Sequence, residues 1–377
     1  MKKIPARHFL LFFCVLSLFF LVLSLSSCGL GSLTDGFREN EGADTVLAPV
    51  TDPITGTAPP TSAVTTPVST ATTAPFTSAA PTAPPATSAP APILYFNPLS
   101  GLPCDGKASS ARPLAFCIKE AAGSFISAAD LVIEAPTESG GTRLFLLGTA
   151  HTGQFPSLTV ASVRPYMAAL ANDFFAISIY KGTSDRDKES TAFLYDTVDL
   201  SEHTSLASPG ALYDLLTEKG IQTGIAGSIA LPYRFTAIGE STVPTAAPST
   251  YASVNFSEAA ATSFTYDHLT RCYTMRSCKA MEADTAPLPS FANLLILFHD
   301  ATERVTKDGC ELSLDTNSGG SGYYISAGNM MPILWRRDPE TSSLILTDSD
   351  GERLTVNRGK TYVGMTSFAF KDRMILN

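Results

Sequence analysis

Several residue patterns that support redox, metal or acyl-transfer chemistry are missing from this sequence. It contains no Cys-x-x-Cys pair and no Gly-x-Ser-x-Gly turn. The glycine-rich run at 318–322 lacks the lysine of a phosphate-binding loop. The histidines are few, and none has a partner at metal-ligand spacing. The sequence therefore predicts no metal and no cofactor.

Basic residues are also scarce. The chain has 26 lysines and arginines against 35 aspartates and glutamates. Three of the basic residues, Lys2, Lys3 and Arg7, stand in the first ten positions, which leaves 23 against 35 in the rest of the chain. A surplus of negative charge repels the phosphate backbone of nucleic acids, so we expect no nucleic-acid partner.

Residues 1–27 have the pattern of a lipoprotein signal peptide. A basic start precedes an apolar run from Phe9 to Leu25, which is shorter than the roughly 20 residues that span a bilayer. Residues 25–29, Leu-Ser-Ser-Cys-Gly, resemble the lipobox, in which small residues precede a cysteine that receives lipid. We expect cleavage before Cys28 and attachment, through lipid on that cysteine, to the extracytoplasmic face of the cell membrane. An uncleaved anchor with a chance cysteine is the alternative.

Residues 28–92 are expected to form a disordered tether. Thr, Pro, Ala and Ser dominate from residue 43 to residue 92, and charge is nearly absent. Such a segment buries too little apolar surface to offset its ordering entropy. In an extended form, about fifty residues would reach on the order of 150 Å, which suits a spacer through a cell wall.

From residue 93 onward the composition is that of a folded protein, and the expected fold class is α+β. Residues 93–240 are predicted to form a mixed α/β domain, with strands at 114–118, 131–135, 144–149 and 175–180, and helices at 165–172 and 209–219. Residues 250–370 are predicted to form a smaller, mainly antiparallel β domain, with strands at 252–255, 272–276, 294–299, 323–327, 331–336, 344–347 and 360–364. Residues 138–142 have the composition of a hairpin connection.

Five cysteines follow Cys28, at positions 104, 117, 272, 278 and 310. An odd number cannot all pair. A bridge between Cys272 and Cys278 is conceivable in an oxidising compartment, but buried free thiols are the favoured interpretation.

Several motifs of the body stand in an order that is typical of one known family. Residues 97–103, Asn-Pro-Leu-Ser-Gly-Leu-Pro, are similar to the opening signature of that family, and residues 112–115 to its first strand. Residues 129–134 with 138–143 resemble its hairpin, residues 162–166 its strand-to-helix corner, and Tyr266, Tyr273 and Trp335 its C-terminal domain. On these motifs the body resembles the YerB-like lipoproteins, a family of unknown function also called domain-of-unknown-function family 3048. The resemblance implies an N-terminal and a C-terminal domain, but the family brings no established activity.

The chain departs from the family pattern at several polar positions. Lys119 and Glu120 replace an Asp-Asn pair, Ala161 replaces an arginine, and Tyr180 replaces a histidine. The segment 202–204, Glu-His-Thr, keeps only the histidine of a Pro-His-Asn motif. If the family has a polar site, the resemblance implies that this member has lost part of it.

Six residues of the body are candidates for a ligand-binding or catalytic site: Glu134, Glu138, Arg143, Arg164, Tyr166 and His203. Glu134 and Glu138 are four apart, so on one strand their side chains would point the same way, and Arg143 could pair with either. Such a carboxylate pair could hydrolyse a glycan. The favoured interpretation is a hairpin held by a charge pair.

Arg164, Tyr166 and His203 could form a second polar cluster. The planar fork of an arginine suits carboxylate or phosphate groups, so an anionic ligand is one interpretation. An arginine that braces a domain joint and a histidine in an ordinary loop are the slightly favoured alternative.

These observations lead to two hypotheses. The preferred one is a non-enzymatic envelope lipoprotein that binds a cell-wall polymer or another envelope protein. The alternative is a hydrolase of wall glycans or peptides that uses Glu134, Glu138 or His203. Convergence of the candidate residues in one open cleft would favour the hydrolase, and their dispersal or burial in pairs would favour the binding protein.

Overall fold

The computed structural model describes the folded body of the protein. The described residues are 94–149, 160–182, 196–202, 209–225, 230–282, 287–307 and 309–377. The predicted signal peptide, Cys28, the tether and His203 lie outside them. Within these ranges, no helix is long and apolar enough to cross a membrane.

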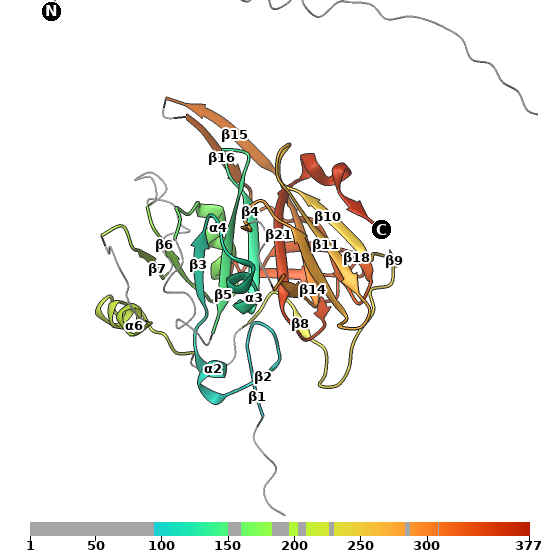
Figure 1. Ribbon diagram of the computed structural model, residues 1–377, viewed down its shortest axis with the longest axis horizontal. Helices are drawn as coiled ribbons and strands as arrows, with labels where there is room; N and C mark the ends of the chain where they lie inside the picture. Colours follow the sequence, from blue (N-terminus) through green and yellow to red (C-terminus); the bar gives the residue numbers. More distant parts are fainter. Residues whose placement is uncertain are drawn as a thin grey trace, which may run out of the picture. The chain divides into compact units, whose positions relative to one another are not determined.

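A large sheet, with eleven strands among the described residues, forms the centre of the body (Figure 1). In spatial order the strands are β19 (Leu344–Thr347), β18 (Asn329–Arg337), β17 (Gly320–Ser326), β14 (Asn293–His299), β21 (Thr361–Ser367), β4 (Leu131–Pro136), β5 (Thr142–Gly148), β3 (Leu114–Ile118), β6 (Ile177–Tyr180) and β7 (Thr197–Asp199), with β9 (Ala247–Pro248) beside β18. The central strands are buried along their whole length and carry mainly apolar side chains, as expected for strands covered on both faces.

This sheet joins the two sequence regions that were expected to form separate domains. Strand β21 pairs in parallel with β14 on one side and with β4 on the other. In the second pairing Val363 lies opposite Ile133, so residues far apart in the chain share one ladder. The N-terminal and C-terminal regions therefore contribute to one continuous sheet.

A second, antiparallel sheet packs on one face of the central sheet. Its strands in order are β13 (Ser290–Phe291), β12 (Cys272–Ser277), β11 (Ala261–Asp267), β10 (Tyr251–Asn255) and β22 (Ile375–Leu376). Burial alternates along β10 and β11, which is the pattern of strands with one covered face. Phe264 and Met275 of this sheet share a core with Ile296 and Tyr362 of the central sheet.

Short helices complete the covering of the central sheet. Helices α3 (Gly123–Ala128) and α6 (Pro209–Glu218) contribute Ile126 and Leu216 to the core under the second sheet. Helix α4 (Pro165–Asn172) lies on the opposite face, where Met167 and Leu170 belong to a separate core. Each face of the central sheet thus has its own apolar core.

Smaller elements surround these layers. They are helix α2 (Gly106–Ser110), the 3-10 helix η2 (Phe368–Arg373), and the strand pairs β1 (Tyr95–Phe96) with β2 (Pro103–Cys104), β8 (Arg234–Phe235) with β20 (Thr355–Val356), and β15 (Ala301–Thr306) with β16 (Gly309–Leu314). The β15–β16 ribbon projects beyond the other elements of the body (Figure 1).

Helix α4 begins at a proline and ends without a glycine. Pro165 stands in the first turn, where its missing N–H leaves no hydrogen bond unmade. After the helix, Phe175 adopts a φ of 58°, a left-handed conformation that costs a residue with a Cβ roughly 1–2 kcal/mol. The strand expected at 175–180 begins only at Ile177 because the chain is still turning at Phe175.

Most of the predicted elements are confirmed, several of them with their bounds. The helix at 165–172 and the strands at 114–118 and 344–347 match those of the structure. Strands β11, β15 and β16 were missed, because their many Thr, Ser and Glu residues give little apolar signal. The fold is confirmed as a mixture of strands and helices in which strands dominate.

The five described cysteines are all free thiols. A bridge between Cys272 and Cys278 is wrong, because Cys272 starts strand β12 and Cys278 follows its end. Six extended residues span roughly 20 Å, whereas the Cα atoms of a disulfide lie within about 7 Å of each other. Burial raises the pKa of the Cys117 thiol to about 12, so this thiol stays protonated.

Candidate functional site

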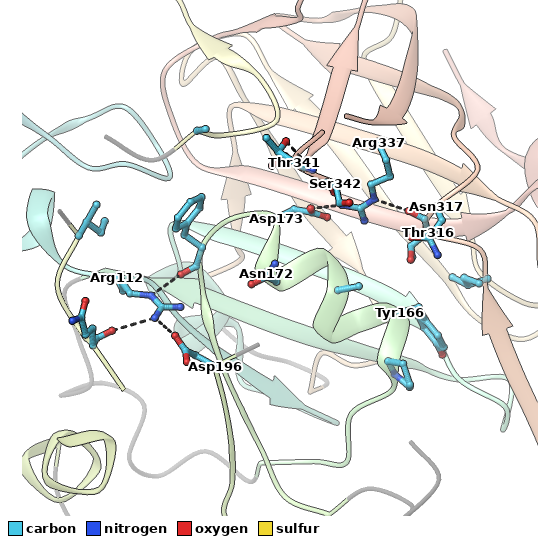
Figure 2. Close-up of a pocket in the computed structure, with 18 of the residues that line it drawn as sticks. Arg112, Tyr166, Asn172, Asp173, Asp196, Thr316, Asn317, Arg337, Thr341 and Ser342 are labelled. Carbon is cyan, nitrogen blue, oxygen red and sulfur yellow. Dashed lines mark hydrogen bonds and ion pairs between the residues drawn. The ribbon is translucent and has the colours of Figure 1, made fainter. Parts of the chain in front are cut away.

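A cleft of about 690 Å³ runs along α4 and is the candidate functional site (Figure 2). Its lining comes from α4 itself, from segments that precede β3 and β7, and from the ends of β16 and β18. It also includes the turn between β18 and β19. The cleft is therefore assembled from parts of the chain that lie far apart in sequence.

The guanidinium of Arg337 fastens one wall of the cleft. It forms an ion pair with Asp173, directly after α4, as Figure 2 shows. Its Nε donates to the carbonyl of Thr316 at 2.7 Å, and a terminal nitrogen donates to the carbonyl of Ser342 at 3.2 Å. One side chain thus ties together the helix end, the loop after β16 and the turn before β19.

Burial changes the acid–base behaviour of Asp173, whose side chain is only 4% exposed. Desolvation raises its pKa to about 6, although the charge and the hydrogen bond of Arg337 act in the opposite direction. Oδ1 accepts from Arg337 and from the N–H of Leu344, whereas the buried Oδ2 has no hydrogen-bond partner in the described part of the chain. The carboxyl therefore keeps an unused acceptor at the wall of the cleft.

A second arginine braces the other end of the cleft. Arg112 forms an ion pair with Asp196, and Figure 2 shows the two side chains side by side. Its Nε donates to the carbonyl of Phe175 at 3.2 Å, and a terminal nitrogen donates to the carbonyl of Gln222 at 3.2 Å. The backbone at the end of α4 is therefore held from this side as well.

The rest of the lining is mostly neutral and polar. Hydroxyl and amide side chains come from Asn172, Gln222, Ser313, Thr316, Asn317, Thr341, Ser342 and Ser343. Phe175 adds an aromatic side chain that is 44% exposed. Because both arginines of the lining are paired with aspartates, the cleft can hydrogen-bond an uncharged polar molecule without exposing it to an unbalanced charge.

Two of the predicted site residues lie at the start of α4. Tyr166 lines the cleft, and its hydroxyl donates to the carbonyl of Pro136 at 2.7 Å. Arg164, the residue before the helix, forms an ion pair with Glu138. These contacts join the β4–β5 hairpin to α4. His203, the third member of the predicted polar cluster, lies outside the described residues.

Glu134 faces the second sheet and has no exposed surface. Its carboxyl accepts from the hydroxyl of Tyr362 at 2.6 Å and from the hydroxyl of Thr262 at 2.8 Å, and the thiol of Cys278 lies 3.5 Å away. Desolvation raises the pKa of Glu134, and these hydrogen bonds act in the opposite direction. A carboxyl enclosed in this way has no route to a substrate.

The predicted pairing of Arg143 with a glutamate is wrong. In the hairpin register Arg143 lies opposite Ala135, so its side chain and that of Glu134 leave the sheet on opposite faces. Glu138 is not on the strand with Glu134, because β4 ends at Pro136. Glu138 lies in the turn and meets Arg164 instead, while Arg143 donates to the carbonyl of Thr142 at 3.3 Å.

His299 is a second group near the cleft whose pKa is changed by burial. It is 2% exposed, its Nδ1 lies 2.8 Å from the carbonyl of Asp315, and its ring centre lies 4.5 Å from that of Trp335. Desolvation lowers its pKa to about 4, and the positive charge of Arg337 adds to this effect. The ring is therefore neutral near pH 7. Within the described ranges, no group of three or more His, Cys, Asp and Glu side chains is placed to hold a metal ion.

Sequence reasoning missed four residues of the cleft: Arg112, Asp173, Phe175 and Arg337. The run Asn172–Phe175 offered one signal. A helix end that has two aromatic residues and lacks a glycine is unusual. Arg337 offered none, since its partner Asp173 is 164 positions away in the chain.

Two family models match the body in succession. The protein of unknown function (DUF3048) N-terminal domain matches residues 99–215, and the DUF3048 C-terminal domain matches residues 252–363. Together they cover more than half of the chain. The chain belongs to the DUF3048 family. No curated protein matches it.

The DUF3048 chain also resembles a solved structure. The crystal structure of the YerB protein from Bacillus subtilis is similar with a TM-score of 0.60 and 22% identity, over 75% of this chain and 99% of that one. The resemblance to YerB-like proteins is thereby confirmed at the level of fold and family. In this DUF3048 protein the cleft forms where the two matched regions meet, with Arg112 and α4 from one and Arg337 from the other.

Proposed function

We propose that this DUF3048 protein is a non-enzymatic, lipid-anchored envelope protein whose folded body binds an envelope component in the cleft along α4. The observation that supports this most is the cleft itself. It is polar, has a volume in the range of roughly 300–1,000 Å³ typical of ligand sites, and is braced by Arg337 and Arg112.

The anchor and the tether determine where the body would act. The lipobox-like sequence before Cys28 supports attachment by lipid on the extracytoplasmic face of the cell membrane. A Pro- and Thr-rich segment of about fifty residues then places the body at the distance of the wall. A cell-wall polymer and other envelope proteins are the molecules within its reach.

The chemistry of the cleft supports binding rather than catalysis. Its two carboxyls, Asp173 and Asp196, are both engaged in ion pairs with arginines. The alternative, a hydrolase that uses Glu134, Glu138 or His203, loses support from the geometry of the two glutamates. Glu134 is enclosed, and Glu138 is paired with Arg164. That alternative predicts muropeptide turnover that disappears in Glu138→Gln, so unchanged turnover would remove this residue from the mechanism.

A capture experiment with the full chain in detergent tests the proposal. The protein is mixed with purified peptidoglycan and, separately, with a membrane extract. Ala169, a partly buried residue of α4, lines the cleft, so Ala169→Trp would add bulk there, and Leu269→Trp, at a position 95% exposed and away from the cleft, is the matched control. We expect enrichment of one of the two materials by the wild type and the control but not by Ala169→Trp. No enrichment of either material, or equal enrichment by Ala169→Trp, would contradict it.

The anchor has a separate test. Cys28→Ala removes the residue that would receive the lipid, so the fatty-acid label that the wild type should incorporate in growing cells should be lost. Absence of the label from the wild type would favour the uncleaved anchor.

A further inference from the structure

Phe175 combines two features that are unfavourable for a residue with no role in binding. Its aromatic ring is 44% exposed, and its backbone adopts the left-handed conformation, with φ at 58°. Glycine is the residue that ends a helix in this way without strain. The exposed position gives the ring little packing to compensate for the strain, and backbone strain of this kind is enriched at binding sites.

The surrounding structure holds Phe175 in this conformation from two sides. Its N–H donates to the carbonyl of Asn172 at 2.8 Å, and its carbonyl accepts from Arg112 at 3.2 Å. The next N–H, that of Ala176, donates to the carbonyl of Ala171 at 3.2 Å. The aromatic side chain is therefore presented at the cleft by a backbone that is fixed before any ligand arrives.

The charge and the polar groups of the cleft restrict the class of ligand. The two arginines and two aspartates of the described lining pair with each other, so within the described residues neither arginine is left over for a phosphate or a carboxylate. Hydroxyl and amide groups occupy much of the remaining lining, and the strained turn residue Ser342, with φ at 58°, contributes one of them. An aromatic face next to neutral hydrogen-bonding groups suits a sugar ring, which presents C–H groups on its faces and hydroxyls on its edge.

We propose that the cleft along α4 binds an uncharged glycan strand, with one sugar ring stacked on Phe175 and its hydroxyl groups bonded to the polar side chains opposite. This inference rests on the proposed function, since it names the ligand class of the same cleft. Asp173 also lines the cleft, but its unpartnered Oδ2 has almost no accessible surface, so the sugar hydroxyls bond to the neutral side chains instead. Arg337 and Arg112 position the cleft walls and leave contact with the sugar to neutral groups.

The test measures binding of two probes to the full chain in detergent. One is the β-1,4-linked hexamer of N-acetylglucosamine. The other is peptidoglycan from which an amidase has removed the peptides and whose freed lactyl carboxylates have been capped as methyl amides, so that both probes are uncharged. Phe175→Gly removes the ring and relieves the backbone strain, so the melting temperature should stay the same or rise. Affinity for both probes should fall by about tenfold or more. Phe175→Trp keeps an aromatic face and should retain binding.

Two further variants keep the test decisive. Phe175→Asn tolerates the left-handed backbone and removes the ring, so it replaces Phe175→Gly if that variant is unstable. Ala327→Gly relieves the same kind of strain, at a φ of 50°, away from the cleft, and should bind as the wild type does.

Three outcomes would overturn the inference. The first is wild-type affinity for both glycan probes in Phe175→Gly and Phe175→Asn. The second is binding to intact peptidoglycan but not to the stripped glycan, which would identify a peptide ligand and leave the proposed function standing. The third is no binding to any wall material together with Ala169-dependent capture of a membrane protein, which would also leave the proposed function standing.

Discussion

The two faces of the central sheet each enclose a carboxyl whose pKa is raised by burial, and the two carboxyls have opposite surroundings. Glu134 faces the second sheet, with hydroxyls of Tyr362 and Thr262 as its donors and no cation among its hydrogen-bond partners. Asp173, at the end of α4, has a guanidinium as partner and lies on a cleft. One carboxyl is sealed inside the fold, and the other is next to space that a ligand can fill.

This difference shows that a perturbed pKa alone does not mark a functional site. Glu134 was a candidate from sequence because it stands four residues from Glu138, which would place the two side chains on one face of a strand. Its donors come from β11 and β21, so its carboxyl joins the second sheet to the central one. Accessible space, which only the cleft side offers, separates a structural carboxyl from one that can meet a ligand.

Removal of the sealed carboxyl should have the largest effect. Glu134→Ala leaves the hydroxyls of Tyr362 and Thr262 without an acceptor and opens a cavity, so the free energy of unfolding should fall by about 4 kcal/mol. Glu134→Gln keeps an acceptor and should cost less than half as much. Urea unfolding followed by circular dichroism measures both, and equal losses for the two variants would show that the hydrogen bonds are not what stabilises this centre.

Loss of the guanidinium on the cleft side should come next. Arg337→Ala leaves Asp173 buried without its cation and frees the loop at Thr316, so the free energy of unfolding should fall by about 3 kcal/mol. The neighbouring Arg336 is exposed, and Arg336→Ala should change it by less than about 0.5 kcal/mol. Similar losses in the two variants would remove Arg337 as the brace of the cleft.

Acid should destabilise the cleft side through His299. Its pKa in the folded protein is about 4, below its ordinary value of 6.5, so the unfolded chain takes up the proton first. The stability that the neutral ring contributes is present above pH 6.5 and is lost as the pH falls toward 4, by up to roughly 3 kcal/mol. His299→Gln should flatten the fall in melting temperature between pH 6.5 and pH 4.

Asp173 provides the matched control with the opposite sign. Its folded pKa of about 6 lies above the ordinary 3.8, so the folded protein binds this proton before the unfolded chain does. The stability that the bound proton contributes is lost as the pH rises through about 6. Asp173→Asn should therefore make the wild-type decline between pH 6 and pH 4 steeper. The same pH profile in the wild type and in both variants would contradict the burial of the two groups.

The Glu138–Arg164 pair should have the smallest effect. Both side chains are partly exposed, at 16% and 30%, so solvent screens their attraction. A double-mutant cycle with Glu138→Gln and Arg164→Gln should give a coupling energy below about 1 kcal/mol. A coupling of several kcal/mol would show that this pair stabilises the fold as a buried interaction does, and not as a surface ion pair.

The elements of the fold were largely predictable, and the site was not. Local pattern was enough for α4, since Pro165 and the apolar run after it specify a helix start and a buried face. The parallel pairing of β4 with β21 has no local signal, because each strand is simply buried on both faces along its whole length. The side of the sheet to which Glu134 points depends on register, and a shift by one residue would have reversed it.

What the sequence determined by itself is the organisation along the chain. The predicted export signal, the lipobox-like run before Cys28, the predicted tether and the DUF3048 motifs are local patterns, and local patterns can be recognised without a fold. The tertiary structure decided which polar residues meet. Asp173 and Arg337 stand 164 positions apart, and Glu134 and Tyr362 stand 228 apart, so only the packing of the central sheet places one pair at a cleft and encloses the other. The physical reason is that hydrogen bonds and ion pairs act over a few ångströms of space, and separation along the chain does not set that distance.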